Sequence, residues 1–132
     1  MIAEGRGGPL RIGILGGADS VMDAMFRRPG DDWWPEEERI ATADVDRLLV
    51  NAKNVVGLDV LVTHTPPASI TTAMTNGGRP HPSSLLVEAA WRELGGGGDN
   101  PPLEVICGHM HESLQDPLRR VEVLSMLGVT LR

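Results

Sequence analysis

The residues best suited to chemistry in this chain are histidines that follow short apolar runs. His64 comes directly after the run LDVLVT, and His109 and His111 come after the run LEVIC and Gly108. Neutral imidazole is the commonest side-chain ligand of divalent transition metals. Any one of these histidines alone is better explained as a residue that hydrogen-bonds a loop. Three of them at the ends of two apolar runs favour a shared metal site.

His109 and His111 are two residues apart and follow a strand and a glycine. Both rings can point toward one cavity if the backbone there leaves regular pleating. Gly108 is expected to permit a close backbone approach, since it carries no Cβ. His81 lies before Pro82 and is interpreted as a loop residue. Cys107 is interpreted as a small apolar core residue, because nothing nearby in sequence activates it.

The elements that must position these histidines alternate between strands and helices. Apolar runs predict strands over 10–15, 58–63 and 103–107, and the tail 120–132 is predicted as two strands around Gly128 or one bent strand. Thr42 is expected to cap a helix over 43–53, and Ser83 or Ser84 a helix that runs through Leu94. This order predicts an α/β layered fold, in which ligands bind beyond the carboxyl ends of the strands.

Composition limits the class of protein. The 132 residues include 12 Lys and Arg against 18 Asp and Glu, and the net charge of -6 argues against a nucleic-acid platform. The single cysteine excludes an internal disulfide. No apolar run approaches the roughly 20 residues of a membrane span, and no signal-peptide pattern is present, so a cytoplasmic location is expected. Residues 1–9 are expected to be a flexible lead-in to one domain over 10–132.

Three segments together resemble the calcineurin-like metallophosphoesterase family. Asp59-Val-Leu-Val-Thr-His-Thr-Pro-Pro67 is similar to its His-Thr-Pro-Pro block, and Cys107-Gly-His-Met-His111 is similar to its Gly-His-x-His block. Upstream, Gly16-Gly-Ala-Asp-Ser20 and Trp33-Trp-Pro-Glu-Glu37 resemble a stretch of one branch of small enzymes. The second block alone is a weak signal, but the combination and its order along the chain are fairly specific.

The resemblance implies a two-metal enzyme that hydrolyses phosphoesters. Its fold would be a sandwich of two mixed β-sheets with flanking helices. Transferred position by position, His64 and His109 would bind one divalent metal (Mn, Fe or Zn) and His111 the other. Two metals clamp phosphate oxygens and supply a bridging hydroxide as nucleophile.

The chain departs from the family pattern at its beginning. It contains no Asp-x-His and no Asn-His pair, so the first metal-binding blocks are missing and the chain resembles the C-terminal part of the domain. At most one metal is therefore expected here, and activity of the chain alone is not expected. Asp19, Asp23 and Glu112 could substitute as ligands, although no spacing argument supports them. The strands over 10–15 and 103–107 are expected to lack neighbours, which favours a partner chain or self-association.

Three functions remain open. The chain could be a phosphoesterase completed by another polypeptide, a non-catalytic binding or assembly protein with the same fold remnant, or a mononuclear hydrolase that uses its three histidines alone. No catalytic or substrate-binding residue is assigned. The remaining conspicuous residues are expected to be structural: Trp33 and Trp34 in loop packing, Glu36 and Glu37 at a helix start, and Arg27 and Arg28 on the surface.

Overall fold

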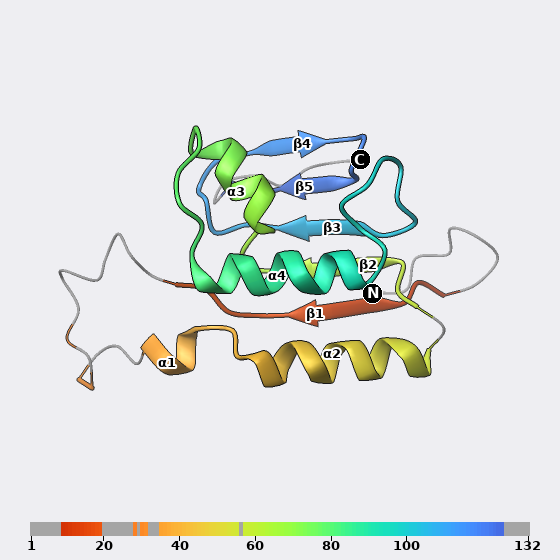
Figure 1. The fold of residues 1–132 in the computed structure, drawn as a ribbon, viewed down its shortest axis with the longest axis horizontal. Coiled ribbons are helices and arrows are strands. Elements are labelled where there is room, and N and C mark those ends of the chain that lie inside the picture. Colours follow the sequence, from red (N-terminus) through yellow and green to blue (C-terminus); the bar gives the residue numbers. More distant parts are fainter. Residues whose placement is uncertain (1–8, 20–27, 29, 32–34, 56, 126–132) are drawn as a thin grey trace.

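The computed structural model describes residues 9–19, 28, 30–31, 35–55 and 57–125, and their elements alternate as the sequence predicts (Figure 1). The strands are β1 (Ile12–Leu15), β2 (Val60–Thr63), β3 (Glu104–Cys107), β4 (Leu114–Asp116) and β5 (Val121–Val123). The helices are α1 (Pro35–Glu38), α2 (Thr42–Asn54), α3 (Ala68–Met74) and α4 (Pro82–Glu93). The α/β class is therefore confirmed. No helix in this described part of the chain is long and apolar enough to cross a bilayer.

The five strands form one sheet with the order β1-β2-β3-β5-β4. Strands β1, β2, β3 and β5 are parallel, and β4 pairs with β5 in the antiparallel direction. Gly13 lies opposite Leu61, and Leu61 lies opposite Val105. Residues that lie opposite each other on neighbouring strands point to the same face of the sheet. The carboxyl ends of the four parallel strands consequently lie along one edge.

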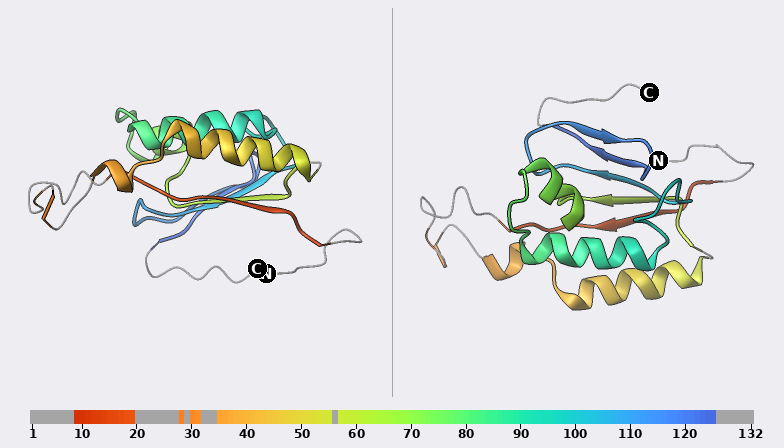
Figure 2. Two further views of the ribbon diagram at one scale, coloured as in Figure 1. Left: turned by 90° about the horizontal axis from the view of Figure 1, so that it is seen from below. Right: turned by 45° about the horizontal axis from the view of Figure 1, so that its top comes forward.

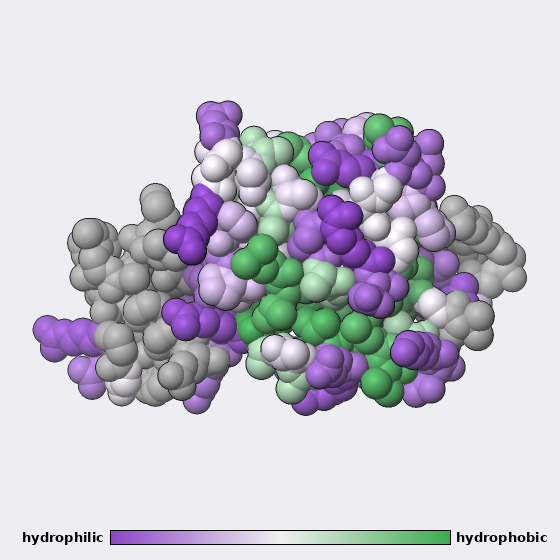
Figure 3. All heavy atoms as spheres, viewed as in Figure 1, coloured by the Kyte–Doolittle hydropathy of each residue, from purple (hydrophilic) through white to green (hydrophobic). Residues whose placement is uncertain are grey.

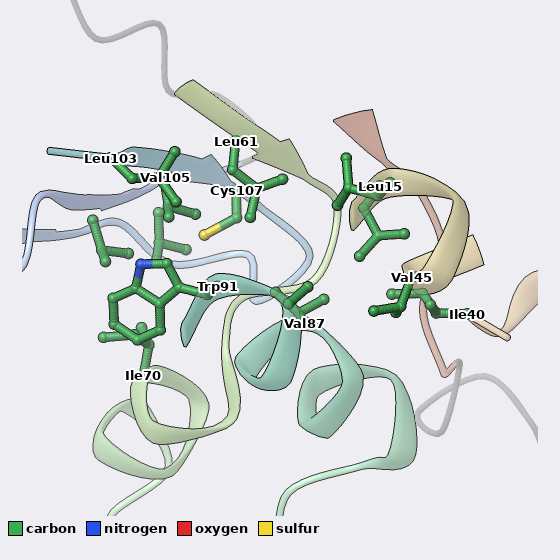
Figure 4. Packing of buried hydrophobic residues seen from close by; sticks show 14 residues of the cluster. Leu15, Ile40, Val45, Leu61, Ile70, Val87, Trp91, Leu103, Val105 and Cys107 are labelled. Atoms are coloured by element: carbon green, nitrogen blue, oxygen red, sulfur yellow. The ribbon is translucent and has the colours of Figure 1, made fainter. Parts of the chain in front are cut away.

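The helices α2, α3 and α4 all lie on one face of the sheet (Figure 2). That face carries the buried apolar side chains of the strands, and Figure 4 shows them packed against the helices. The indole of Trp91 in α4 points toward the strands, between Ile70 of α3 and Val105 of β3. The opposite face carries Ile14, which is 74% exposed.

Both long helices begin one to three residues away from the predicted caps. The residue that precedes α2 is Ala41, not Thr42, and the Asp44 carboxylate accepts the Ala41 N–H at 2.9 Å. Helix α4 begins at Pro82 after His81, so neither Ser83 nor Ser84 is its cap. Proline is favoured in the first turn because its missing N–H would have no helical partner there.

The prediction about missing neighbours is right for one strand and wrong for the other. Among the described strands, β1 lies at the edge and pairs with β2 alone, whereas β3 is central and pairs with both β2 and β5. The predicted tail strand is present as β5, and the segment 126–132 with Gly128 lies outside the described residues. Within the described residues there is one sheet. Helix α3 and strand β4 were not predicted from the sequence.

Candidate metal centre

The predicted site residues lie just beyond the carboxyl ends of β2 and β3. These strands are parallel neighbours, with Val62 opposite Ile106. His64 directly follows β2, and His109 follows β3 after one glycine. The parallel pairing therefore carries both histidines to the same edge of the sheet, which is where ligands of such sheets bind.

The loop after β2 is fixed by two threonine hydroxyls and two prolines. Thr63 Oγ1 donates to the carbonyl of Thr65 at 2.7 Å, and Thr65 Oγ1 donates to the carbonyl of Gly17 beyond β1 at 2.8 Å. Pro66 and Pro67 are fully buried. His64 lies between these anchored residues and is itself exposed, so its ring projects from a rigid turn.

The loop after β3 leaves regular strand geometry at both of its histidines. His109 and His111 have φ angles of 69° and 58°, in the left-handed region. The Gly108 N–H donates to the carbonyl of His64 at 2.9 Å and ties the two loops together. A Cβ at Gly108 would lie 3.7 Å from its nearest neighbour, an ordinary contact, so the close approach of the two loops does not require glycine.

The rings of His64 and His109 face each other through their nitrogens. Nδ1 of His109 lies 3.2 Å from Nε2 of His64, and the ring planes cross at 65° (ring centroids 5.0 Å apart). Bonds of about 2.0 to 2.1 Å at tetrahedral to right angles place two nitrogen ligands of one metal about 2.9 to 3.4 Å apart. The observed separation falls within this range. It is also the length of a hydrogen bond in which one ring nitrogen donates to the other.

The electrostatic surroundings of His109 favour its neutral form. Burial lowers its pKa most, the charges of His64, His111 and His81 lower it further, and Glu38 opposes them. A metal ligand must be unprotonated, so the lowered pKa keeps His109 ready to bind at a pH where an ordinary histidine is partly protonated. The sequence did not single out Glu38, and it gave His81 no role beyond that of a loop residue. No local signal could show that both lie near His109.

His111, the third predicted ligand, is exposed and lies within electrostatic reach of His109. Across the described residues, no three His, Cys, Asp or Glu side chains are grouped closely enough to hold a metal ion. The structure thus brings together two of the three predicted ligands at ligand distance.

The carboxylates considered as substitute ligands are differently placed. Asp19 is buried and accepts the Ser83 N–H at 2.8 Å, and its other oxygen pairs with Arg39 Nε at 2.9 Å. Both of its oxygens therefore take part in contacts that join the segment after β1 to α4 and to Arg39. Glu112 is exposed, and Asp23 lies outside the described residues.

Of the other residues discussed from the sequence, Cys107 is a free, buried thiol whose pKa is raised to about 12 by burial. It is a core residue, as predicted. Glu36 and Glu37 lie in α1, and Arg28 is exposed. Arg27, Trp33 and Trp34 lie outside the described residues.

Comparison with protein-family models, with curated proteins and with solved structures finds no match to this chain. The metallophosphoesterase resemblance therefore rests on the sequence blocks alone.

Proposed function

We propose that this chain is the C-terminal part of a metal-dependent phosphoesterase of the calcineurin-like type, and that it binds one divalent cation through His64 and His109. The observation that carries the proposal is the 3.2 Å separation of Nδ1 of His109 and Nε2 of His64. The parallel strands β2 and β3 hold the two histidines at the edge of the sheet where ligands bind. The fold that goes with this proposal is one half of a β-sandwich with flanking helices.

A bound divalent cation would polarise a phosphoryl oxygen and lower the pKa of a coordinated water. The chain's own contribution is to hold two neutral imidazoles in place. The Gly108 N–H bond to the His64 carbonyl fixes the two backbones relative to each other. Burial of His109 disfavours the protonated ring that would compete with the metal. Two nitrogen ligands are fewer than the three of ordinary catalytic sites, so hydrolysis of a phosphoester requires further ligands from His111 or from a partner chain.

A non-catalytic binding or assembly protein is the second candidate. It is favoured by the finding that the described residues contain no group of three ligating side chains. A mononuclear hydrolase that uses the three histidines alone requires His111 to move toward the pair. Metal choice among Mn, Fe and Zn, and the cytoplasmic location, stay predictions from the sequence.

Metal binding separates the first two candidates. Purified apo-protein is titrated with Zn²⁺ and Mn²⁺ by calorimetry, next to His64→Ala and His109→Ala. The matched control is His81→Ala, which removes an exposed histidine at the same edge that is not at ligand distance in the structure. We expect one site per chain, weakened at least about tenfold in the first two variants and less than about threefold in the control. Absence of a site in the wild type, or an equal loss in all variants, would reject the metal centre.

Activity is assayed separately with p-nitrophenyl phosphate and bis-p-nitrophenyl phosphate, with and without Mn²⁺. The chain alone is expected to hydrolyse neither substrate above the rate of free metal. Turnover that depends on His64, His109 and His111 together would instead establish the mononuclear hydrolase.

A further inference from the structure

Helices α2 and α4 lie side by side on the face of the sheet that they cover (Figure 1, Figure 2). The space-filling view from this side shows apolar side chains gathered over the two helices (Figure 3). On these helices Val50 is 59% exposed and Leu85 is 51% exposed. Leu49 and Leu86 are partly buried and pack against the core cluster. Apolar side chains gathered on an exposed helix layer are typical of a surface that binds another protein.

One stripe of α2 combines this apolar surface with two opposite charges. The residues that α2 buries against the sheet recur at helical spacing. A neighbouring stripe, at positions i, i+3, i+4 and i+7, consists of Asp46, Leu49, Val50 and Lys53. Asp46 and Lys53 are exposed, and no ion pair among the described residues includes either of them. The stripe is therefore apolar in the middle, negative at one end and positive at the other.

The order of these charges makes the stripe complementary to a second copy of itself. Asp46 lies three residues before Leu49, and Lys53 lies three residues after Val50. A two-fold axis that passes between Leu49 and Val50 reverses the direction of α2. Asp46 of each copy would then face Lys53 of the other copy, so the interface would contain the same ion pair twice. Parallel packing of the two α2 helices would instead place like charges together.

The size of the two helices limits the strength of such a dimer. α2 has 13 residues and α4 has 12, so they are about 20 Å and 18 Å long. Side by side, with each helix about 10 Å across, they present roughly 400 Å² per copy. Stable complexes bury about 800 Å² per partner, so this face suits a weak and transient dimer. We expect a Kd of about 10 to 100 μM, which leaves the chain monomeric in dilute solution.

We propose that the face formed by α2 and α4 binds a second copy of the chain, with the two α2 helices antiparallel about a two-fold axis between Leu49 and Val50. The apolar side chains in the middle would supply affinity, and the ion pairs at the two ends would fix the orientation. This inference does not depend on the metal proposal, because neither helix contains a histidine.

The test measures self-association by sedimentation velocity, with EDTA present, over a range of about 5 to 500 μM that spans the expected Kd. Asp46→Lys and Lys53→Asp each replace both ion pairs of the dimer with repulsion, so each should weaken it at least about fivefold. The double variant Asp46→Lys/Lys53→Asp reverses both pairs and should return to within about twofold of the wild type. Asp99→Lys is the matched control, because it makes the same change of charge at an exposed residue outside both helices.

A mixture of the two single variants tests the two-fold arrangement itself. The stripe is positive at both ends in Asp46→Lys and negative at both ends in Lys53→Asp. Each variant alone should associate weakly, whereas an equimolar mixture restores both ion pairs and should associate about as tightly as the wild type. A mixture of Asp99→Lys with Lys53→Asp has the same net charges but restores only one pair, so it should remain weaker.

The proposal is overturned if the wild type stays monomeric at the highest concentration. It is also overturned if the Asp46 and Lys53 variants dimerise as tightly as Asp99→Lys does, since the dimer would then use another surface. A mixture of the two single variants that associates no better than each variant alone would reject the antiparallel arrangement. Because EDTA is present throughout, failure here leaves the result of the metal titration unaffected.

Discussion

Asp19 connects three segments next to the candidate metal centre, and its removal gives the sharpest test of the structure. Its carboxylate accepts the Ser83 N–H in the first turn of α4 and pairs with Arg39 between α1 and α2. Ser83 Oγ in turn accepts the Ile40 N–H at 3.2 Å. Asp19 and Ser83 are both buried, so water cannot easily replace the lost acceptor in Asp19→Ala.

The expected loss of stability follows from these contacts. Leaving a buried N–H without its charged acceptor costs about 1.5 to 3 kcal/mol. The pair with Arg39, whose side chain is 52% exposed, adds at most about 1 kcal/mol. The free energy of unfolding should therefore fall by about 1.5 to 4 kcal/mol. With an unfolding entropy near 2.1 cal/mol/K per residue, this lowers the Tm by roughly 5 to 14 °C.

Thermal and urea unfolding, followed by circular dichroism, measure both quantities. Asp19→Asn keeps an acceptor for the Ser83 N–H and should recover more than half of the loss. Asp46→Ala, an exposed carboxylate on α2, should change stability by less than about 0.5 kcal/mol. If Asp19→Asn is as stable as the wild type but loses metal binding, Asp19 is a ligand and the structural role inferred here is wrong.

Three further predictions concern single residues. Gly96→Ala should lower the free energy of unfolding by about 2 kcal/mol or more, because the new Cβ would overlap the buried indole of Trp91. Gly98 has open space around it, so Gly98→Ala should leave the free energy of unfolding measured in urea unchanged. Cys107 should resist labelling by iodoacetamide at pH 8 in the native protein, because burial raises its pKa to about 12. In urea the same thiol should react quickly. Rapid labelling of the native protein would contradict the burial of Cys107. Burial lowers the pKa of His109, so below about pH 6.5 the unfolded chain binds more protons than the folded chain does. The free energy of unfolding should therefore fall as the pH drops through that value toward the folded pKa. Urea unfolding at pH 7.5 and at pH 5.5 should show a smaller difference between the two pH values in His109→Gln than in the wild type.

The strands and helices with strong periodic patterns were predictable because their stabilising contacts repeat along the segment. α3 was missed because its sequence, ASITTAM, has weak helix propensity. Its contacts come from distant residues: Ile70 is buried against α4, and Ser69 bonds Glu88 through both its N–H and its hydroxyl. β4 has three residues and depends on its pairing with β5, which no local pattern reveals.

Some residues of the candidate site could likewise be placed from the sequence, and others could not. His64 and His109 could be paired from the sequence because each follows an apolar strand and neighbouring parallel strands end at one edge. His81 could not, because its position depends on the hydrogen bond between Ser83 and Asp19, which are 64 residues apart. Glu38 approaches the site through the bond from the Ala18 N–H to its carbonyl, another contact between distant segments.

The edge position of β1 also has a consequence for synthesis on the ribosome. Ile12 pairs with Val60, so β1 has no partner strand until 48 further residues have been added. At about 5 to 20 residues per second, this wait lasts roughly 2 to 10 s. β3 waits only for the 16 residues that separate Val105 from Val121, and β2 is already present when β3 emerges. The uncharged Ile-Gly-Ile-Leu segment of β1 is thus accessible to chaperones and to neighbouring nascent chains for longer than any other described strand. Among the described residues, β1 has no partner strand on its outer side even after folding.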